Sequence, residues 1–247
     1  MRVEVPAIGA PIVSALAFRA DVAGLAPSEV LAAVDPLSSV AAPNGRCALH
    51  DVDTAARVLR SKGGGIELEE MPGVDVEAGE AALRLTPRLY PDMATAVVGV
   101  VGEAGPASVG GVPATVRVLF TDLPPPATAE LTVPPVPRIV TLGGALPAPH
   151  SAVSAAADLE VAVAFGDGAS VEVRPYGATL GLSCPVGDGG RVVIPRALLS
   201  RVAAGRRFWA SFDAVRRETA ALALAGEPGT VHISVEVRSS TVMELRP

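Results

Sequence analysis

The chain has 247 residues, of which 49% are apolar, so it can bury a core as one large or two ordinary domains. Its net charge is −6 and no basic patch is interleaved with aromatic residues, which speaks against nucleic-acid binding. Two cysteines are too few for a disulfide-stapled small fold or a four-cysteine zinc site, and no apolar run is long enough to span a membrane.

The N-terminal segment gives the first predictions about location and structure. It lacks a basic region followed by an apolar one, so either the protein is cytoplasmic or a signal segment has been removed. Residues 27–36, PSEVLAAVDP, predict a short helix with Ser28 as N-cap and a stop at Asp35-Pro36.

The segment CALHDVD brings metal-ligand side chains close together in sequence. A metal site could use these residue types, which are Cys47, His50, Asp51 and Asp53. At strand periodicity, however, His50 points away from the other three, so a ligand set would need a bent loop. The favoured interpretation is therefore a solvated turn without a metal.

An acidic stretch follows, and calcium favours such oxygen ligands. The acidic residues are Glu67, Glu69, Glu70, Asp75, Glu77 and Glu80. Their spacing is not that of an EF-hand, and Ile66 and Leu68 alternate with Glu67 and Glu69 as in a half-buried strand. We therefore expect solvated hairpin positions, with weak calcium binding as the alternative.

Proline-rich sequence marks the expected domain boundary. Pro124–Pro126 and Pro134–Pro137 cannot lie in a central strand and favour stiff, extended chain. This predicts an N-terminal β-rich domain of residues 1–137 and a C-terminal β-sandwich of residues 138–247.

Period-2 alternation recurs along the chain and predicts an all-β fold of antiparallel sheets, with one or two short helices. Val116, Val118 and Phe120 share one face of a predicted strand. In a second strand the apolar face comprises Leu159, Val161, Val163 and Phe165. In a third, Val231, Ile233, Val235 and Val237 oppose His232, Ser234, Glu236 and Arg238. Turn signals in the second half fall at the spacing of a sandwich, and we expect well under a fifth of residues in helix.

The stretch LSCPVGDGGRVVIPRALLSRV, residues 182–202, predicts a strand, a tight turn, a second strand and a helix. Pro195 stands at the start of this helix and Gly205 follows its end. Cys184 alternates with polar positions and should lie in the core. The alternatives are a disulfide to Cys47 and a reactive thiol. We predict two free thiols, because nothing in the sequence brings the two halves together.

No group of residues in the sequence predicts catalysis, and no cofactor site is indicated. His150 and His232 have no neighbours suggesting a relay. Trp209 is expected to be partly in the core. Four arginines, Arg206, Arg207, Arg216 and Arg217, are expected on a solvated strand face.

Residues 158–202 resemble the carboxy-terminal half of uncharacterised secreted or lipid-anchored β-sandwich proteins from the envelopes of Gram-negative bacteria with GC-rich genomes. The matching features, in order, are Asp158-Leu159, Gly166-Asp167, Cys184, Ile194-Pro195 and Leu198-Leu199. The resemblance implies an immunoglobulin-like sandwich in the periplasm, on the outer membrane surface or outside the cell, and no activity.

The leading hypothesis is therefore a non-enzymatic structural or binding protein of the bacterial envelope, with no catalytic, cofactor or metal site. Its partner would be a protein or a glycan, and a lipid anchor would lie outside this chain. Two alternatives stay open. One is a carbohydrate- or peptide-active hydrolase using paired carboxylates, and the other is a calcium-stabilised adhesin module.

Overall fold

The protein is all-β, as the alternation predicts. The computed structural model describes residues 1–6, 9–21, 45–51, 66–69, 73–89, 97–123, 125–148, 151–177, 180–223 and 231–247. Strands make up 65% of these residues and helix 5%. Within these ranges, no helix is long and apolar enough to cross a membrane.

Most strands belong to one 12-stranded sheet, whose main path is β3-β5-β9-β2-β1-β19-β18-β15-β16-β4. Its strands from the first half of the chain are β1 (Arg2–Pro6), β2 (Ile12–Ala17), β3 (Arg19–Asp21), β4 (Ala48–Asp51), β5 (Ile66–Glu69), β8 (Thr86–Leu89) and β9 (Val97–Ser108). Those from the second half are β13 (Ala152–Ser154), β15 (Ala169–Pro175), β16 (Leu180–Pro185), β18 (Phe208–Leu222) and β19 (Val231–Arg246). Most pairs are antiparallel, but β1 and β13 pair with β19 in parallel, and β5 pairs with β9 in parallel.

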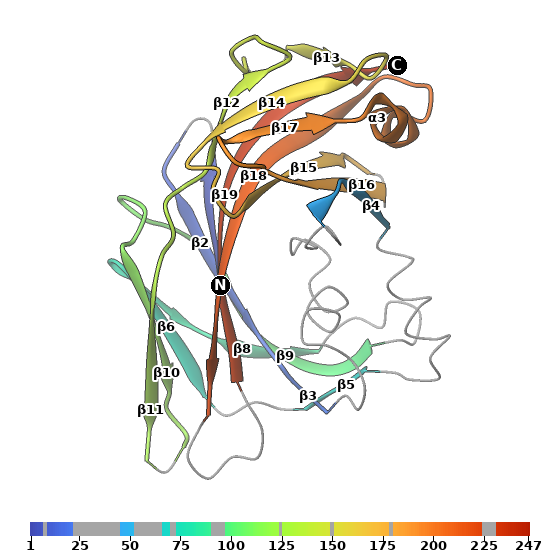
Figure 1. Cartoon of the computed structure of the whole chain (residues 1–247). Helices are drawn as coiled ribbons and strands as arrows, with labels where there is room; N and C mark the ends of the chain where they lie inside the picture. Colours follow the sequence, from blue (N-terminus) through green and yellow to red (C-terminus); the bar gives the residue numbers. More distant parts are fainter. Residues whose placement is uncertain are drawn as a thin grey trace.

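Two smaller sheets pack against the long one. The first has the order β11-β10-β6-β7 and the second β12-β14-β17. Their strands are β6 (Val74–Ala78), β7 (Ala81–Arg84), β10 (Thr115–Phe120), β11 (Ala127–Thr132), β12 (Arg138–Leu142), β14 (Leu159–Ala164) and β17 (Arg191–Ile194). Figure 1 shows the long sheet curved like a half-pipe, with both small sheets on its convex side.

Each small sheet closes one hydrophobic core against the long sheet. The upper core lies under β12-β14-β17, and its largest members include Phe212, Leu182 and Ile194. The lower core lies under β11-β10-β6-β7 and includes Phe120 and Val116. Sheet-on-sheet packing of this kind buries the alternating apolar face that the sequence predicts. Phe165, which we expected to continue that face in β14, instead has φ 53° after the strand and is exposed.

The one helix in the described ranges is α3 (Arg196–Ala203), which closes one end of the upper core. Pro195 precedes it, as predicted, since its fixed φ suits the start of a helix. The carboxylate of Asp158 accepts a 2.7 Å hydrogen bond from the Arg196 backbone N–H. Gly205, just after the helix, has φ +72°, a conformation that glycine tolerates best. The other predicted helix, residues 27–36, lies outside the described residues.

The proposed boundary near residue 137 falls between the two cores, yet the long sheet crosses it. Ile233, Val235 and Val237 of β19 pack in the lower core, whereas Met243 and Leu245 of the same strand pack in the upper one. The segment between β11 and β12 is also anchored, because the Ser239 hydroxyl donates a 2.5 Å hydrogen bond to the Pro137 carbonyl. The division into residues 1–137 and 138–247 stays a prediction.

Candidate functional site

Three of the four metal-ligand residues of the CALHDVD segment, Cys47, His50 and Asp51, lie in or next to β4 at the edge of the long sheet. Strand β4 pairs with β16, so that His50 is opposite Gly181 and Leu49 opposite Leu182. The His50 ring covers Gly181 so closely that a Cβ there would meet it at 2.3 Å. Asp53 lies outside the described residues. No cluster of three or more potential metal ligands occurs in the part of the chain that the structure describes.

Cys47 and Cys184 form a disulfide, so the prediction of two free thiols is wrong. The sequence separation is 137 residues, and the pairing arises because β4 adds to β16 at the end of a sheet built from both halves of the chain. That adjacency depends on tertiary topology, which no local pattern reveals. The prediction that Cys184 lies in the apolar core is confirmed, since it is fully buried beside Val171 and Leu182.

The acidic stretch is distributed over strands and not gathered around one point. Glu67 and Glu69 are exposed on β5, and Glu77 is exposed on β6. The carboxylates are near arginines: Glu69 is 3.0 Å from Arg19, and Glu77 is 3.2 Å from Arg117. Glu70 lies outside the described residues. Solvated strand and hairpin positions, as favoured from the sequence, describe these residues better than a shared calcium shell.

Two further predictions about single residues change. Trp209, expected to be partly in the core, is 43% exposed. It lies near the start of β18, on the face that carries Asp213 and not on the face that packs into the upper core. Arg217, expected on a solvated face, points to a buried carboxylate on β19, with 2.6 Å between its Nη2 and Glu236 Oε2. Arg206 and Arg207 are exposed, as expected. His232 is exposed on β19, and His150 lies outside the described residues.

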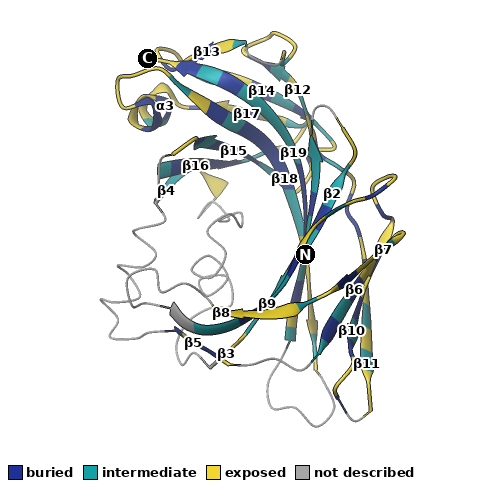
Figure 2. Ribbon diagram, turned by 180° about the vertical axis from the view of Figure 1, so that it is seen from behind, coloured by how far each residue is buried: buried dark blue, intermediate teal, exposed yellow. Residues whose placement is uncertain are grey.

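The face of β15, β18 and β19 that points away from the two cores carries a buried charge network. Its core consists of Glu172, Asp213, Glu236 and Arg238, which are between 1% and 3% exposed. Three further arginines, Arg2, Arg174 and Arg217, surround this core. Sheet register makes the network, since Glu172 is opposite Asp213 and Glu236 is opposite Arg217. Figure 2 shows buried and half-buried residues running along these central strands.

Arg238 is the centre of the network, because its guanidinium reaches all three carboxylates. Its nitrogens lie 2.7 Å from Glu236, 3.0 Å from Asp213 and 3.4 Å from Glu172. Arg174 also contacts Asp213, at 2.7 Å, and lies 3.6 Å from Glu172. Each carboxylate therefore lies within ion-pair distance of at least two guanidinium groups, which compensates its buried charge. Asp213 and Glu236 also accept charge-assisted hydrogen bonds from these arginines.

The alternation in the sequence predicts a solvated strand face at these positions, and the structure shows a buried charge network instead. Glu236 and Arg238 were placed opposite Val235 and Val237, which is correct, but the polar side was assumed to be solvated. One available signal was that the pattern of alternating charges recurs. Residues 170–174, 211–214 and 234–238 all alternate charged or hydroxyl side chains with apolar ones, so that three such strands side by side would collect opposite charges.

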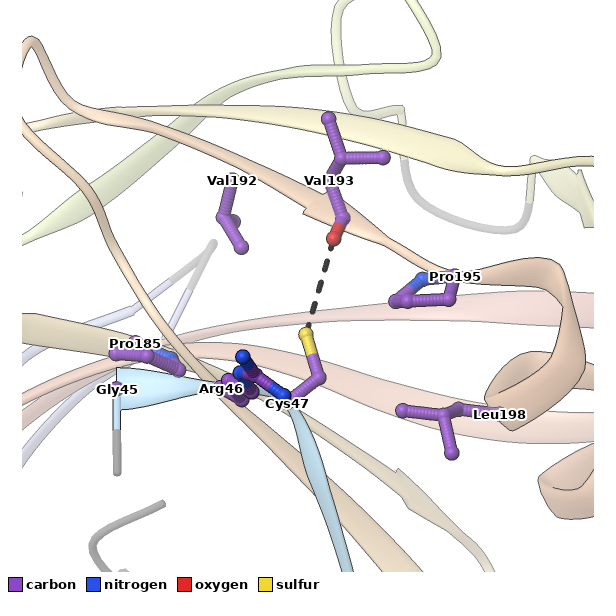
Figure 3. A pocket seen from close by; sticks show the side chains of 8 residues that line it. All are labelled: Gly45, Arg46, Cys47, Pro185, Val192, Val193, Pro195 and Leu198. Carbon is purple, nitrogen blue, oxygen red and sulfur yellow. Dashed lines mark hydrogen bonds between the residues drawn. The ribbon is translucent and has the colours of Figure 1, made fainter. Parts of the chain in front are cut away.

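A pocket of about 390 Å³ lies beside the disulfide, between the start of α3 and the edge of β16 (Figure 3). Its walls are mostly apolar, and Arg46 supplies the only charged side chain among the described residues that line it. The lining residues are Gly45, Arg46, Cys47, Pro185, Val192, Val193, Pro195 and Leu198.

The Val193 carbonyl points into this pocket, where its oxygen lies 3.7 Å from Cys47 Sγ. Because Cys47 is in a disulfide, its sulfur carries no proton, and this approach is a contact and not a donated hydrogen bond. On the same edge of β17, two residues earlier, the Arg191 carbonyl accepts a 3.0 Å bond from Gly187. On this edge of β17, the backbone of Arg191 is thus hydrogen-bonded to Gly187, whereas the backbone of Val193 faces the pocket.

Neither a protein-family model nor a curated protein or solved structure matches the chain. Its fold and site therefore define the protein by themselves: an all-β chain in which a curved sheet carries two cores on one side and an internal charge network on the other.

Proposed function

We propose that the chain is a non-enzymatic structural or binding protein of a bacterial cell envelope. The observation that carries this proposal is the pairing of Glu172, Asp213 and Glu236. A catalytic carboxylate has to exchange a proton or attack a substrate. These three are instead held by two or three arginines each, at 1–3% exposure, an arrangement that fixes strands relative to one another.

The envelope location is supported by the disulfide. Disulfides persist in oxidising compartments such as the periplasm and the cell surface, and are rare in the bacterial cytoplasm. The bridge joins an edge strand to a sheet built from both halves of the chain. Together with the resemblance of residues 158–202 to envelope proteins, this favours an exported protein whose second half is an immunoglobulin-like sandwich.

Cell fractionation with thiol trapping tests the location. Cells producing the protein from its natural gene are lysed in excess iodoacetamide, and the intact mass is measured under denaturing, non-reducing conditions. We expect the protein in the periplasmic or envelope fraction with no added label. A cytoplasmic protein carrying two labels would refute the location.

A hydrolase is the second candidate, because Glu172 and Asp213 are directly opposite on neighbouring strands. Glycoside hydrolysis uses two carboxylates that flank the scissile bond, whereas these two are buried and paired with Arg174 and Arg238. The test is a panel of polysaccharide, peptidoglycan and peptide substrates with wild type, Glu172→Gln and Asp213→Asn. We expect no turnover above background in any of them. Turnover by wild type that both variants lose would establish the hydrolase and end the binding proposal.

A further inference from the structure

We propose that the pocket beside the disulfide binds a small amphipathic carboxylate, with its apolar body inside and its charge at Arg46. This inference rests on the proposed binding role and names a ligand class for it. The volume of about 390 Å³ falls within the range of small-molecule sites in proteins. A folded partner could not enter a space of this size.

The walls select an apolar ligand body. Pro185, Val192, Pro195 and Leu198 present hydrocarbon to the pocket. Val192 belongs to the upper core and Leu198 packs against it, so these two walls are supported from behind by packed side chains. Such walls gain free energy by burying apolar ligand surface, in proportion to the area removed from water.

Arg46 selects a negative charge. It is exposed and makes no ion pair in the part of the chain that the structure describes, unlike the arginines of the charge network. A guanidinium binds a carboxylate with matched donor geometry.

Val193 adds a backbone donor at the same place. Its carbonyl faces the pocket, and in a strand the N–H and C=O of one residue point to the same side. The Val193 N–H on this edge of β17 therefore faces the pocket as well. A carboxylate between Arg46 and this N–H would receive two donors while its hydrocarbon chain contacts Leu198 and Pro185.

The disulfide makes the pocket a fixed feature. Cys47 and its neighbour Arg46 precede β4, and the bridge to the buried Cys184 holds this wall against β16. Preorganisation of this kind lowers the entropy lost when a ligand binds.

Protein-observed NMR with sodium octanoate tests the proposal on the full, oxidised chain. We expect saturable shifts of the Arg46 and Val193 amide signals. Arg46→Met should weaken binding about three- to fivefold, since an exposed charge pair contributes up to about that factor. Raised salt should reduce the difference between wild type and Arg46→Met.

Two further variants serve as controls. Arg138→Met removes another exposed arginine without an ion pair in the described part of the chain, on the outer strand β12, and should bind octanoate as wild type does. Leu198→Phe narrows the pocket and should weaken octanoate and neutral 1-octanol alike. By contrast, Arg46→Met should leave 1-octanol binding unchanged.

Several outcomes would overturn the proposal: no saturable shift, shifts centred away from Arg46 and Val193, or equal weakening by Arg46→Met and Arg138→Met. These failures would leave the envelope location and the absence of turnover untouched. A hydrolase result, conversely, would end the proposed function without altering octanoate binding.

Discussion

The two faces of the hairpin formed by β18 and β19 are both buried, but by opposite means. On one face Phe212 and Val237 pack into apolar cores, and on the other Asp213 and Arg238 are covered and joined by ion pairs. Neighbouring residues in the chain thus enter two different environments. Strand alternation therefore predicts which side chains share a face, but it does not predict whether the polar face is exposed to water.

The largest expected effect is on the charged face. Arg238→Met removes the partner that three buried carboxylates share and should lower the free energy of unfolding by about 3–5 kcal/mol, the cost of removing one member of a buried ion pair. Urea denaturation measures it. Arg216→Met is the matched control, because its partner Glu218 is half exposed, and it should cost less than about 1 kcal/mol. If both variants lost the same unfolding free energy, the burial of the Arg238 ion pairs would have no effect on stability.

On the apolar face, Phe212→Ala should cost about 3–4 kcal/mol, because it removes a fully buried ring and leaves a cavity. The same urea titration gives the value. A loss below about 1 kcal/mol would show that the upper core is loosely packed at this position. The comparison with Arg238→Met then shows which face contributes more to stability.

The disulfide joins the start of the edge strand β4 to Cys184 in the upper core. Replacing both Cys47 and Cys184 by alanine should lower stability by about 3 kcal/mol, the middle of the usual range for a disulfide, because the bridge restricts the unfolded chain. Thermal unfolding with and without reductant checks this. Wild type should lose stability in reductant, and the double variant should not respond to it.

Reduction of the native bridge should also be slow. Attack at the more accessible Cys47 would expel Cys184 as a thiolate into an apolar core, where it is a poor leaving group. Quenched alkylation over time measures the rate, which we expect to rise when urea unfolds the chain. Equal rates in native and unfolded protein would contradict the buried position of Cys184.

The smallest effect on stability is expected at a solvent-exposed ion pair. Arg191 and Glu160 lie on the outer face of β14-β17, 3.4 Å apart and more than half exposed. Arg191→Met should change stability by less than about 0.5 kcal/mol, because solvent screens the pair. A loss of stability as large as that of Arg238→Met would show that exposed and buried ion pairs contribute equally in this protein.

Local structure follows from the sequence alone, because alternation and turn chemistry act over a few residues. The apolar faces of β10, β14 and β19, the helix after Pro195 and the core position of Cys184 all follow from such patterns. Only the tertiary structure decided which strands are neighbours. That choice placed β4 beside β16, joined Cys47 to Cys184, and brought Glu172, Asp213 and Arg238 together from strands whose order in the sheet no local signal specifies.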